Sequence, residues 1–131
     1  MLEVKHCIPD IDSYIRLRKN TGLSPRSRKA VELGLPNSLF AVTVYDDRKV
    51  VGMGRVIGDG GCNYEVVDVA IEPEYQGKGL GRSVMEAIMT YLDANAPEGS
   101  YISMIADVPA LYEKFGFKLC SPNSEGMYIR K

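Results

Sequence analysis

The chain has few cysteines, a single histidine and almost no net charge. Its 131 residues include three cysteines, Cys7, Cys62 and Cys120, and no two of them form a C-x-x-C pair. An odd number of widely spaced cysteines argues against a disulfide framework, so we interpret them as reduced thiols. The only histidine, His6, has no cysteine or carboxylate neighbours at metal-ligand spacing, and the chain lacks a G-x-S-x-G serine elbow. We therefore expect neither a metal site nor a serine hydrolase.

An excess of one charge and long apolar runs are also missing. The formal net charge is −1 at pH 7, which argues against a dedicated nucleic-acid binder. No apolar run approaches the roughly 20 residues that cross a bilayer, and the segment Met1–Lys5 does not begin a signal peptide. Together with the reduced cysteines, these absences predict a cytoplasmic protein that binds neither nucleic acid nor membrane.

What is present is an ordinary globular composition in alternating strands and helices. Hydrophobic residues make up 45% and charged residues 25%, which fits one domain over residues 1–131. Apolar periodicity and turn signals predict strands over 2–7, 39–45, 50–57, 63–71, 101–105, 117–120 and 127–130. They predict helices over 9–19, 24–34, 79–92 and 110–114. This order indicates an α/β fold around a mixed sheet.

The stretch Gln76–Arg82, QGKGLGR, places three alternating glycines between an apolar strand and an apolar helix. The first turn of a helix has free N–H groups and a positive dipole end, and glycine lets an anion approach without meeting a Cβ. The stretch therefore predicts a phosphate cradle. It is not the nucleotide-triphosphate loop, because Gly77-Lys78 runs into Gly79, and it is not G-x-G-x-x-G, because neither residue 82 nor residue 84 is glycine.

The remaining pattern is Q-x-x-G-x-G, at Gln76, Gly79 and Gly81, and it resembles the pyrophosphate-binding motif of the GCN5-related N-acetyltransferase (GNAT) superfamily. Upstream, residues 66–74, VVDVAIEPE, are similar to the fourth strand of that family. Downstream, residues 111–117, LYEKFGF, are similar to its late helix. The resemblance covers residues 40 to 120 and implies a GNAT-like acyl-CoA N-acyltransferase fold, with a mostly antiparallel central sheet flanked by helices.

The resemblance implies acetyl-CoA as cosubstrate, with no metal. The positions that match the family's pyrophosphate contacts are Gln76, Gly77, Lys78, Gly79, Gly81 and Arg82. Main-chain groups of Val69 and Ile71 match those that pair with the pantetheine arm and polarise the thioester carbonyl, which commonly contributes a few kcal/mol. The alternatives are a tight turn without a ligand, a solvated face for the side chains of Lys78 and Arg82, and an ordinary buried strand.

Acetyl transfer to an amine needs a base, because a primary amine is protonated at neutral pH. The resemblance places Glu65 where many members carry the base carboxylate. Strict alternation puts Glu65 on one face with Val67, Val69 and Ile71. A bulge in this strand would change the facing and make Asp68 the competitor. Both carboxylates have the alternative of an ordinary surface or hydrogen-bonded role.

Tyr112 matches the family's general-acid tyrosine, four residues before the glycine of a Gly-Phe pair. A phenol with a pKa of about 10 is protonated at neutral pH and can give its proton to the departing thiolate. The alternative is a tyrosine packed against its helix. The chain departs from the family pattern at Ile105, where many members have asparagine, and Asp107 is a candidate replacement for that cofactor contact.

These residues predict an N-acetyltransferase that transfers acetyl directly from acetyl-CoA to the amine of a small molecule or a protein, in a ternary complex. One alternative is an acyltransferase with a different acyl chain. Another is a non-catalytic acyl-CoA binding or sensing domain, which would need neither Glu65 nor Tyr112. The acceptor, the acyl chain and the oligomeric state, a homodimer included, stay open. We interpret the basic residues of 16–29 as solvated helix faces, with the steering of anions as the alternative.

Overall fold

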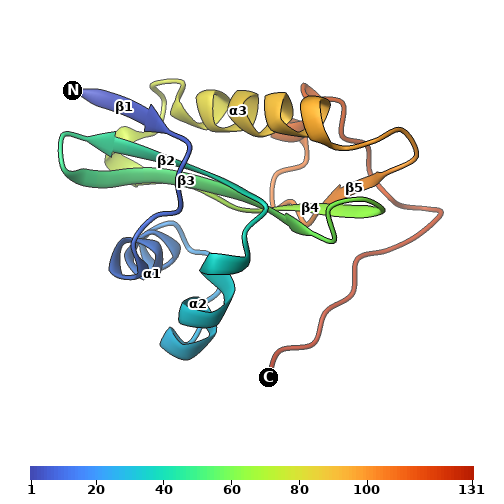
Figure 1. Cartoon of the computed structure of the whole chain (residues 1–131), viewed down its shortest axis with the longest axis horizontal. Helices are drawn as coiled ribbons and strands as arrows, with labels where there is room; N and C mark the ends of the chain where they lie inside the picture. The colour runs from blue at the N-terminus through green and yellow to red at the C-terminus, as the bar shows by residue number, and fades with distance from the viewer.

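The structure, a computed structural model, describes residues 1–131 and is built around one five-stranded sheet in the order β1-β2-β3-β4-β5. The strands are β1 (Leu2–Lys5), β2 (Phe40–Asp46), β3 (Lys49–Gly58), β4 (Asn63–Ile71) and β5 (Tyr101–Met104). Neighbours from β1 to β4 are antiparallel, whereas β5 runs parallel to β4 (Figure 1). The predicted mixed, mostly antiparallel sheet is confirmed.

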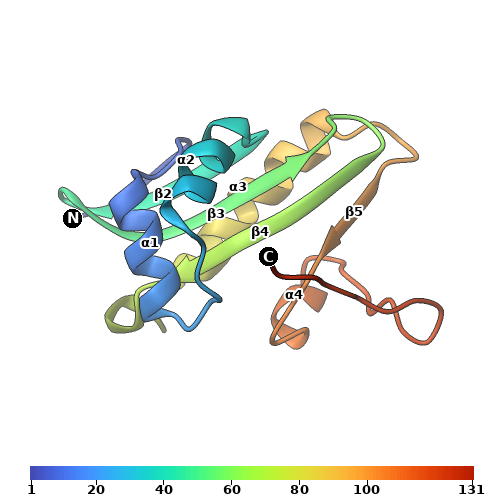
Figure 2. The same cartoon turned by 90° about the horizontal axis from the view of Figure 1, so that it is seen from below.

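Helices cover both faces of the sheet. Helix α3 (Leu80–Asn95) lies on one face, and α1 (Ile11–Asn20) with α2 (Arg28–Gly34) lies on the other (Figures 1 and 2). The short helix α4 (Ala110–Glu113) follows β5, and two 3₁₀ turns occupy Leu35–Asn37 and Pro73–Tyr75. None of the helices combines the length and the hydrophobicity that crossing a membrane requires.

Capping residues set the starts of the first two helices. The side chain of Asp10 accepts a hydrogen bond of 3.0 Å from the N–H three residues further on, so α1 begins at Ile11, two residues after the start of the predicted range. Helix α2 begins at Arg28, four residues after the start of the predicted range, because Ser27 is its N-cap residue and Ser24 lies outside the helix. The carbonyl of Ser24 instead accepts a hydrogen bond of 2.8 Å from Arg18, which keeps Ser24 in the loop.

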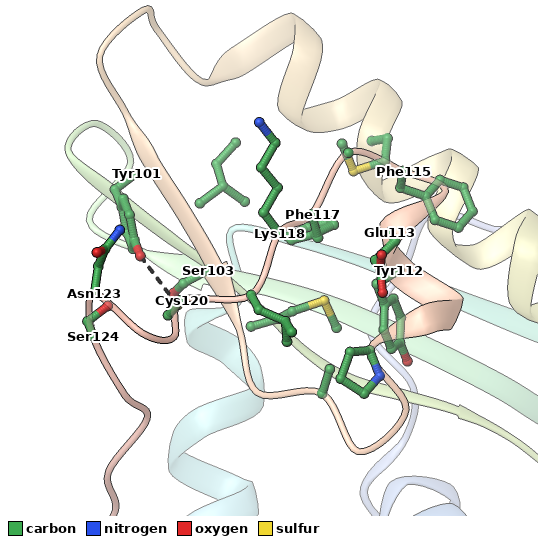
Figure 3. A pocket seen from close by; sticks show the side chains of 17 residues that line it. Tyr101, Ser103, Tyr112, Glu113, Phe115, Phe117, Lys118, Cys120, Asn123 and Ser124 are labelled. Atoms are coloured by element: carbon green, nitrogen blue, oxygen red, sulfur yellow. Dashed lines mark hydrogen bonds between the residues drawn. The ribbon is translucent and has the colours of Figure 1, made fainter.

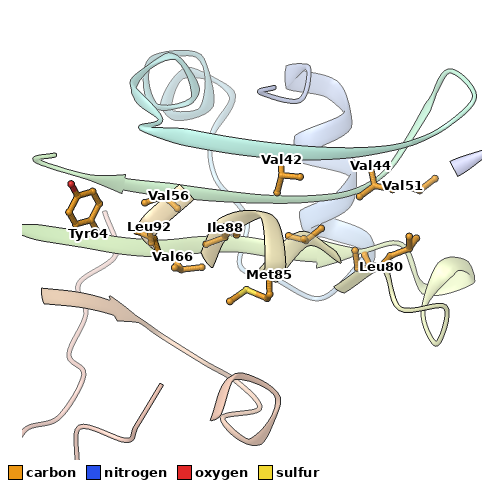
Figure 4. Close-up of a cluster of buried hydrophobic side chains, with 12 residues drawn as sticks. Val42, Val44, Val51, Val56, Tyr64, Val66, Leu80, Met85, Ile88 and Leu92 are labelled. Atoms are coloured by element: carbon orange, nitrogen blue, oxygen red, sulfur yellow. The ribbon is translucent and has the colours of Figure 1, made fainter. Parts of the chain in front are cut away.

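The main core lies between α3 and the sheet (Figure 4). Its twelve buried side chains are Val42, Val44, Val51, Val56, Tyr64, Val66, Ile71, Leu80, Val84, Met85, Ile88 and Leu92. The helix approaches so closely at Gly54 that a Cβ there would lie 2.6 Å from Cγ1 of Val84. A second cluster packs α1 and α2 on the opposite face, and it is formed by Tyr14, Leu17, Val31, Leu35, Val50, Met53 and Ala70.

Strand β4 carries a bulge at Asp68 and Val69. The ladder partners on the two sides of the bulge are separated by one residue in β3 and by two in β4: Arg55 with Val67, and Met53 with Ala70. Asp68 has a φ of +60°, in the left-handed region that aspartate tolerates better than most side chains. Such a bulge re-aims the side chains that follow it.

The bulge divides β4 into two parts that face differently. Glu65 lies between Tyr64 and Val66, which are buried against α3, so its own side chain is on the α1 side. Beyond the bulge, Val69 and Ile71 pack with the α3 cluster. The prediction from strict alternation, that Glu65 shares a face with these two residues, is therefore wrong, and the bulge is the reason.

The last two predicted strands are also wrong. Residues 117–120 run past β5 without joining the sheet, and residues 121–131 are exposed and form no strand. An apolar, β-rich segment becomes a strand only where another strand supplies hydrogen-bond partners. Because the chain turns at residues 121–123, it leaves the outer edge of β5 without a neighbour.

Candidate active site

The glycine loop connects the end of β4 to the start of α3. Gly77 and Gly79 both have a φ of +80°, a backbone conformation that residues other than glycine rarely adopt. Gly79 is also the N-cap residue of α3. A Cβ placed on either glycine would meet no atom within 4 Å. The backbone of the loop is therefore open to a ligand.

The loop presents a run of free hydrogen-bond donors. The backbone hydrogen bonds before and after it are donated by Gln76, to Pro73 at 3.3 Å, and by Ser83, to Gly79 at 3.1 Å. The N–H groups of residues 77–82 between them have no acceptor in the chain. These N–H groups and the positive end of the dipole of α3, a helix of 16 residues, form a site suited to a phosphate or diphosphate.

Side chains around the loop brace it and add positive charge. The side-chain amide of Gln76 donates a hydrogen bond of 3.0 Å to the carbonyl of Ile71, which ties the loop to the last residue of β4. Lys78 and Arg82 are exposed. The Nζ of Lys78 lies 5.2 Å from the ring centroid of Tyr75, a cation–π arrangement that holds the charge beside the glycines.

A gap opens between β4 and β5 next to this loop. The parallel pairing ends where Val66 pairs with Met104, and beyond that point no strand lies against this side of β4. The N–H of Glu72 donates to β3, and backbone groups alternate between the two sides of a strand, so the N–H groups of Val69 and Ile71 point into the gap. An extended ligand can pair with them as an added strand does.

Asp68 is buried and fully engaged. Its side chain is 6% exposed, and its carboxylate accepts hydrogen bonds from Tyr14 at 2.9 Å, from Arg55 at 2.7 Å and from Arg18. A buried carboxylate requires such partners, because an unpaired charge away from water is very costly. This Asp68 cluster (Asp68, Arg18, Arg55 and Tyr14) fixes the bulge to β3 and α1, and it leaves neither oxygen of Asp68 free for a substrate.

The Asp68 cluster also changes the acidity of its tyrosine. Burial raises the pKa of Tyr14, and the negative charge of Asp68 raises it further, although the two arginines oppose this effect. Tyr14 is therefore a neutral hydrogen-bond donor at physiological pH.

A second buried carboxylate, Glu72, also holds α1 against the sheet. It accepts hydrogen bonds from Arg16 at 2.6 Å and from Asn20 at 2.9 Å. The interpretation of the basic residues as solvated is therefore wrong for Arg16 and for Arg18, although it holds for Arg28, whose ion pair is exposed. No local pattern in the sequence indicates these pairs, because the acidic partners lie 56 and 50 residues further along the chain.

Glu65 is half-buried on the α1 side of β4, where its backbone lies between Ile57 of β3 and Ser103 of β5. Unlike Asp68 and Glu72, it makes no ion pair. A carboxylate held by the sheet and not engaged with the protein is available to a substrate.

Tyr112 projects from α4 and packs against the α3 cluster, half-buried. Burial raises the pKa of its phenol above the usual value of about 10, and the negative charge of Asp107 raises it further. The phenol therefore keeps its proton at neutral pH. Asp107 acts here through its charge, a role that the sequence did not predict.

A cavity of about 590 Å³ lies beside β5, between that strand, α4 and residues 115–124 (Figure 3). Of the residues predicted to form the site, only Tyr112 lines it.

The structure thus brings the glycine loop, Val69 and Ile71 together as one continuous surface, and places Glu65 on the other side of the bulge. The cavity is a separate feature at the outer edge of the sheet.

Comparison with known proteins agrees with this geometry. The family described as Acetyltransferase (GNAT) domain matches residues 36–119. An uncharacterized N-acetyltransferase, ycf52, from Pyropia yezoensis is 32% identical over 119 residues, which cover 86% of the chain and 67% of that protein. The chloroplastic GCN5-related N-acetyltransferase 2 of Arabidopsis thaliana is 33% identical over 63% of the chain and 32% of its own length.

Solved structures share the fold. The crystal structure of SA2161 from meticillin-resistant Staphylococcus aureus, a probable acetyltransferase, is 50% identical and superposes with a TM-score of 0.95 over 100% of both chains. The GNAT family N-acetyltransferase YhbS from Escherichia coli, solved in complex with CoA, is 22% identical, with a TM-score of 0.67 over 92% of this chain and 70% of its own. The chain belongs to the GNAT acetyltransferase family.

Proposed function

We propose that the chain is an N-acetyltransferase that moves acetyl from acetyl-CoA to a primary amine by direct transfer in a ternary complex. The observation that carries the proposal is the run of unpaired N–H groups over residues 77–82, which adjoins the open side of β4 in a member of the GNAT family. A diphosphate and an extended amide-containing arm are the chemistry that this surface accepts.

The residues fit acetyl-CoA at its diphosphate and at its pantetheine arm. The diphosphate suits the N–H groups of residues 77–82, with Lys78 and Arg82 adding charge at the rim and Gln76 bracing the loop. The pantetheine arm suits the main-chain groups of Val69 and Ile71 in the gap. When bound, acetyl-CoA supplies an acetyl group already activated as a thioester.

The proton transfers are assigned to residues of the chain. Glu65 removes a proton from the ammonium form of the acceptor, so that the neutral amine can form the new N–C bond. An N–H of Val69 or Ile71 donates to the carbonyl oxygen as negative charge develops there. After the attack the nitrogen loses its second proton to solvent, and Tyr112 gives its proton to sulfur as the C–S bond breaks. Glu65 then releases its proton to solvent and Tyr112 recovers one from solvent, so that each turnover releases one proton.

Asp68 has a different role in this proposal. Both of its oxygens are occupied by arginine and tyrosine donors, so it acts as a positioning residue that holds the bulge from which the N–H groups of Val69 and Ile71 are aimed. Glu65 is preferred as the base because no ion pair competes for its carboxylate.

The experiment is an assay of CoA thiol release by the purified chain with a panel of small amines, amino-acid derivatives and peptides. We expect release that requires both acetyl-CoA and an amine, with an N-acetylated product in the mass spectrum. Longer acyl-CoA thioesters, compared on the same acceptor, test the alternative acyl chains. Tight binding of acetyl-CoA without acetylation of any acceptor would favour the sensing domain instead.

A further inference from the structure

A second cavity, of about 340 Å³, lies between α1, α2 and the loop of residues 21–27 that joins them. It is on the same face of the sheet as the side chain of Glu65. Three of the residues that line it, Arg18, Lys19 and Arg26, are basic and none is acidic, and the other lining residues are apolar or aromatic. An apolar wall with a few charged groups is typical of a site for a small molecule.

The positive charge around this cavity exceeds the negative charge. Arg18 shares the single carboxylate of Asp68 with Arg55, so the Asp68 cluster as a whole has an excess positive charge. Lys19 and Arg26 are exposed, and neither makes an ion pair. Charges of one sign that line a concave site attract ligands of the opposite sign. The cavity therefore favours an anionic ligand.

Two guanidinium groups converge on one serine of the loop. Arg26 donates a hydrogen bond of 2.8 Å to the hydroxyl oxygen of Ser24, and Arg18 donates one of 3.3 Å to the same atom. Both also donate to the carbonyl of Ser24. Guanidinium groups bind carboxylates and phosphates most strongly, whereas these acceptors are neutral. Arg26 thus lies beside another positive charge with only neutral partners, and an anionic oxygen would be a better acceptor for it.

One molecule can reach both this cavity and Glu65. Tyr14 and Arg18 of the cavity wall bind Asp68 of β4, and Glu65 precedes Asp68 by three residues in that strand. Three residues of a strand span about 10 Å. The loop between α1 and α2 passes across β4 (Figure 2). An acceptor whose amine meets Glu65 can therefore place a second group, at roughly this distance, in the cavity.

We propose that the acceptor is an amine that also carries an anionic group, a carboxylate or a phosphate. Arg26 and Lys19 bind the anionic group at the cavity while the amine lies at Glu65. Tyr14 and Leu23 of the cavity wall contact the chain between the two groups. The proposal rests on the proposed function, because it takes Glu65 as the base. It excludes amines that carry positive charges only, since the cavity repels them.

The first test compares acceptors that differ in their terminal charge. Extended triglycine separates its amine and its carboxylate by about 10 Å, and triglycinamide has the same amine without the negative charge. The corresponding phosphate pair is 6-aminohexyl phosphate and 6-aminohexanol. We expect the anionic member of a pair to be acetylated with a kcat/KM at least about tenfold higher, mainly through a lower KM. Spermidine, with positive charges only, should be a poor acceptor.

The second test removes the two cations. Arg26→Gln and Lys19→Gln should each raise the KM for the anionic acceptor, and together they should bring the kcat/KM values of the anionic and neutral acceptors close to each other. Arg26→Lys keeps the charge and should keep part of the preference. The control is Lys29→Gln, because Lys29 is also exposed and without an ion pair but does not line the cavity; this variant should keep the full preference. Circular dichroism checks that each variant is folded.

A preference in one pair only supports the proposal and identifies the anion. Equal kcat/KM values within both pairs, or a preference that survives Arg26→Gln/Lys19→Gln, would overturn the proposal and leave acetyl transfer standing. If no acceptor is acetylated, the proposed function fails, and calorimetry with triglycine and 6-aminohexyl phosphate, with and without CoA, tests the anion site by itself. Binding that Arg26→Gln weakens would support the site, whereas no binding, or binding that does not depend on Arg26, would overturn it.

Discussion

The buried Asp68 cluster gives the sharpest prediction about stability. Arg18→Met keeps a long, flexible side chain in the same space but removes the guanidinium that binds Asp68 and the carbonyl of Ser24. Breaking a buried ion pair typically costs about 3–5 kcal/mol, because the remaining charge stays buried without its partner. Arg55 still binds Asp68 at 2.7 Å, so we expect the lower end, about 3 kcal/mol.

The chain offers a matched control in the same pair of helices. Arg28→Met also breaks an arginine–aspartate pair, between Arg28 and Asp12 at 2.8 Å, but both side chains are exposed. An exposed pair contributes little to stability, since water replaces the lost contact. The difference between the two variants therefore measures burial rather than charge.

The assay is urea unfolding followed by circular dichroism, from which the free energy of unfolding is extrapolated. A loss of about 3 kcal/mol is a large fraction of the 5–15 kcal/mol that stabilises a typical domain. The double variant Arg18→Met/Asp68→Asn should lose less than the sum of the two single losses, because neutral asparagine no longer needs the arginine. If Arg18→Met and Arg28→Met cost the same, or if the double variant is additive, the account of the Asp68 cluster is wrong.

Three further predictions concern the reaction. Gly79→Asp and Gly81→Asp place a negative charge in the cradle and should abolish CoA binding in calorimetry, so near-native affinity in folded variants would exclude the loop. Glu65→Gln should slow turnover near neutral pH and recover as rising pH frees the amine, with cofactor affinity nearly unchanged; an unaltered pH–rate profile would remove Glu65 as the base. Because burial and the charge of Asp107 raise the pKa of Tyr112, its phenol stays protonated at neutral and mildly alkaline pH, and the wild-type rate should show no descending limb there; a fall between about pH 8 and 9 that Tyr112→Phe removes would contradict this.

Local patterns in the sequence predicted much of the fold. The spacing of apolar residues predicted the bounds of β2, β3, β4 and α3 within a few residues. This worked because the apolar side chains that make the pattern are the ones that pack in the core. The glycine spacing likewise predicted the turn, and Gly77 and Gly79 both have the positive φ for which only glycine is well suited.

Features that depend on distant residues were only partly predictable from the sequence. The family resemblance raised a bulge in β4 as an alternative, but Arg18 and Arg55, which stabilise it at Asp68, come from α1 and β3 and carry no local mark of that role. The segments 117–120 and 127–130 have strand-like composition, yet whether a strand forms depends on an available edge elsewhere. The two arginines decide in which direction the N–H groups of β4 point. The course of residues 117–130 decides what covers the outer edge of β5.

The measurement that tests the central claim most directly is the turnover of Tyr112→Phe beside its affinity for acetyl-CoA, on an amine that the wild type acetylates. The substitution deletes one hydroxyl and keeps the ring, so folding and acetyl-CoA binding should be nearly unchanged, with a stability change under about 1.5 kcal/mol. Loss of the general acid should lower kcat at least about tenfold. Unchanged turnover in a folded variant that binds acetyl-CoA normally would contradict the assignment of Tyr112.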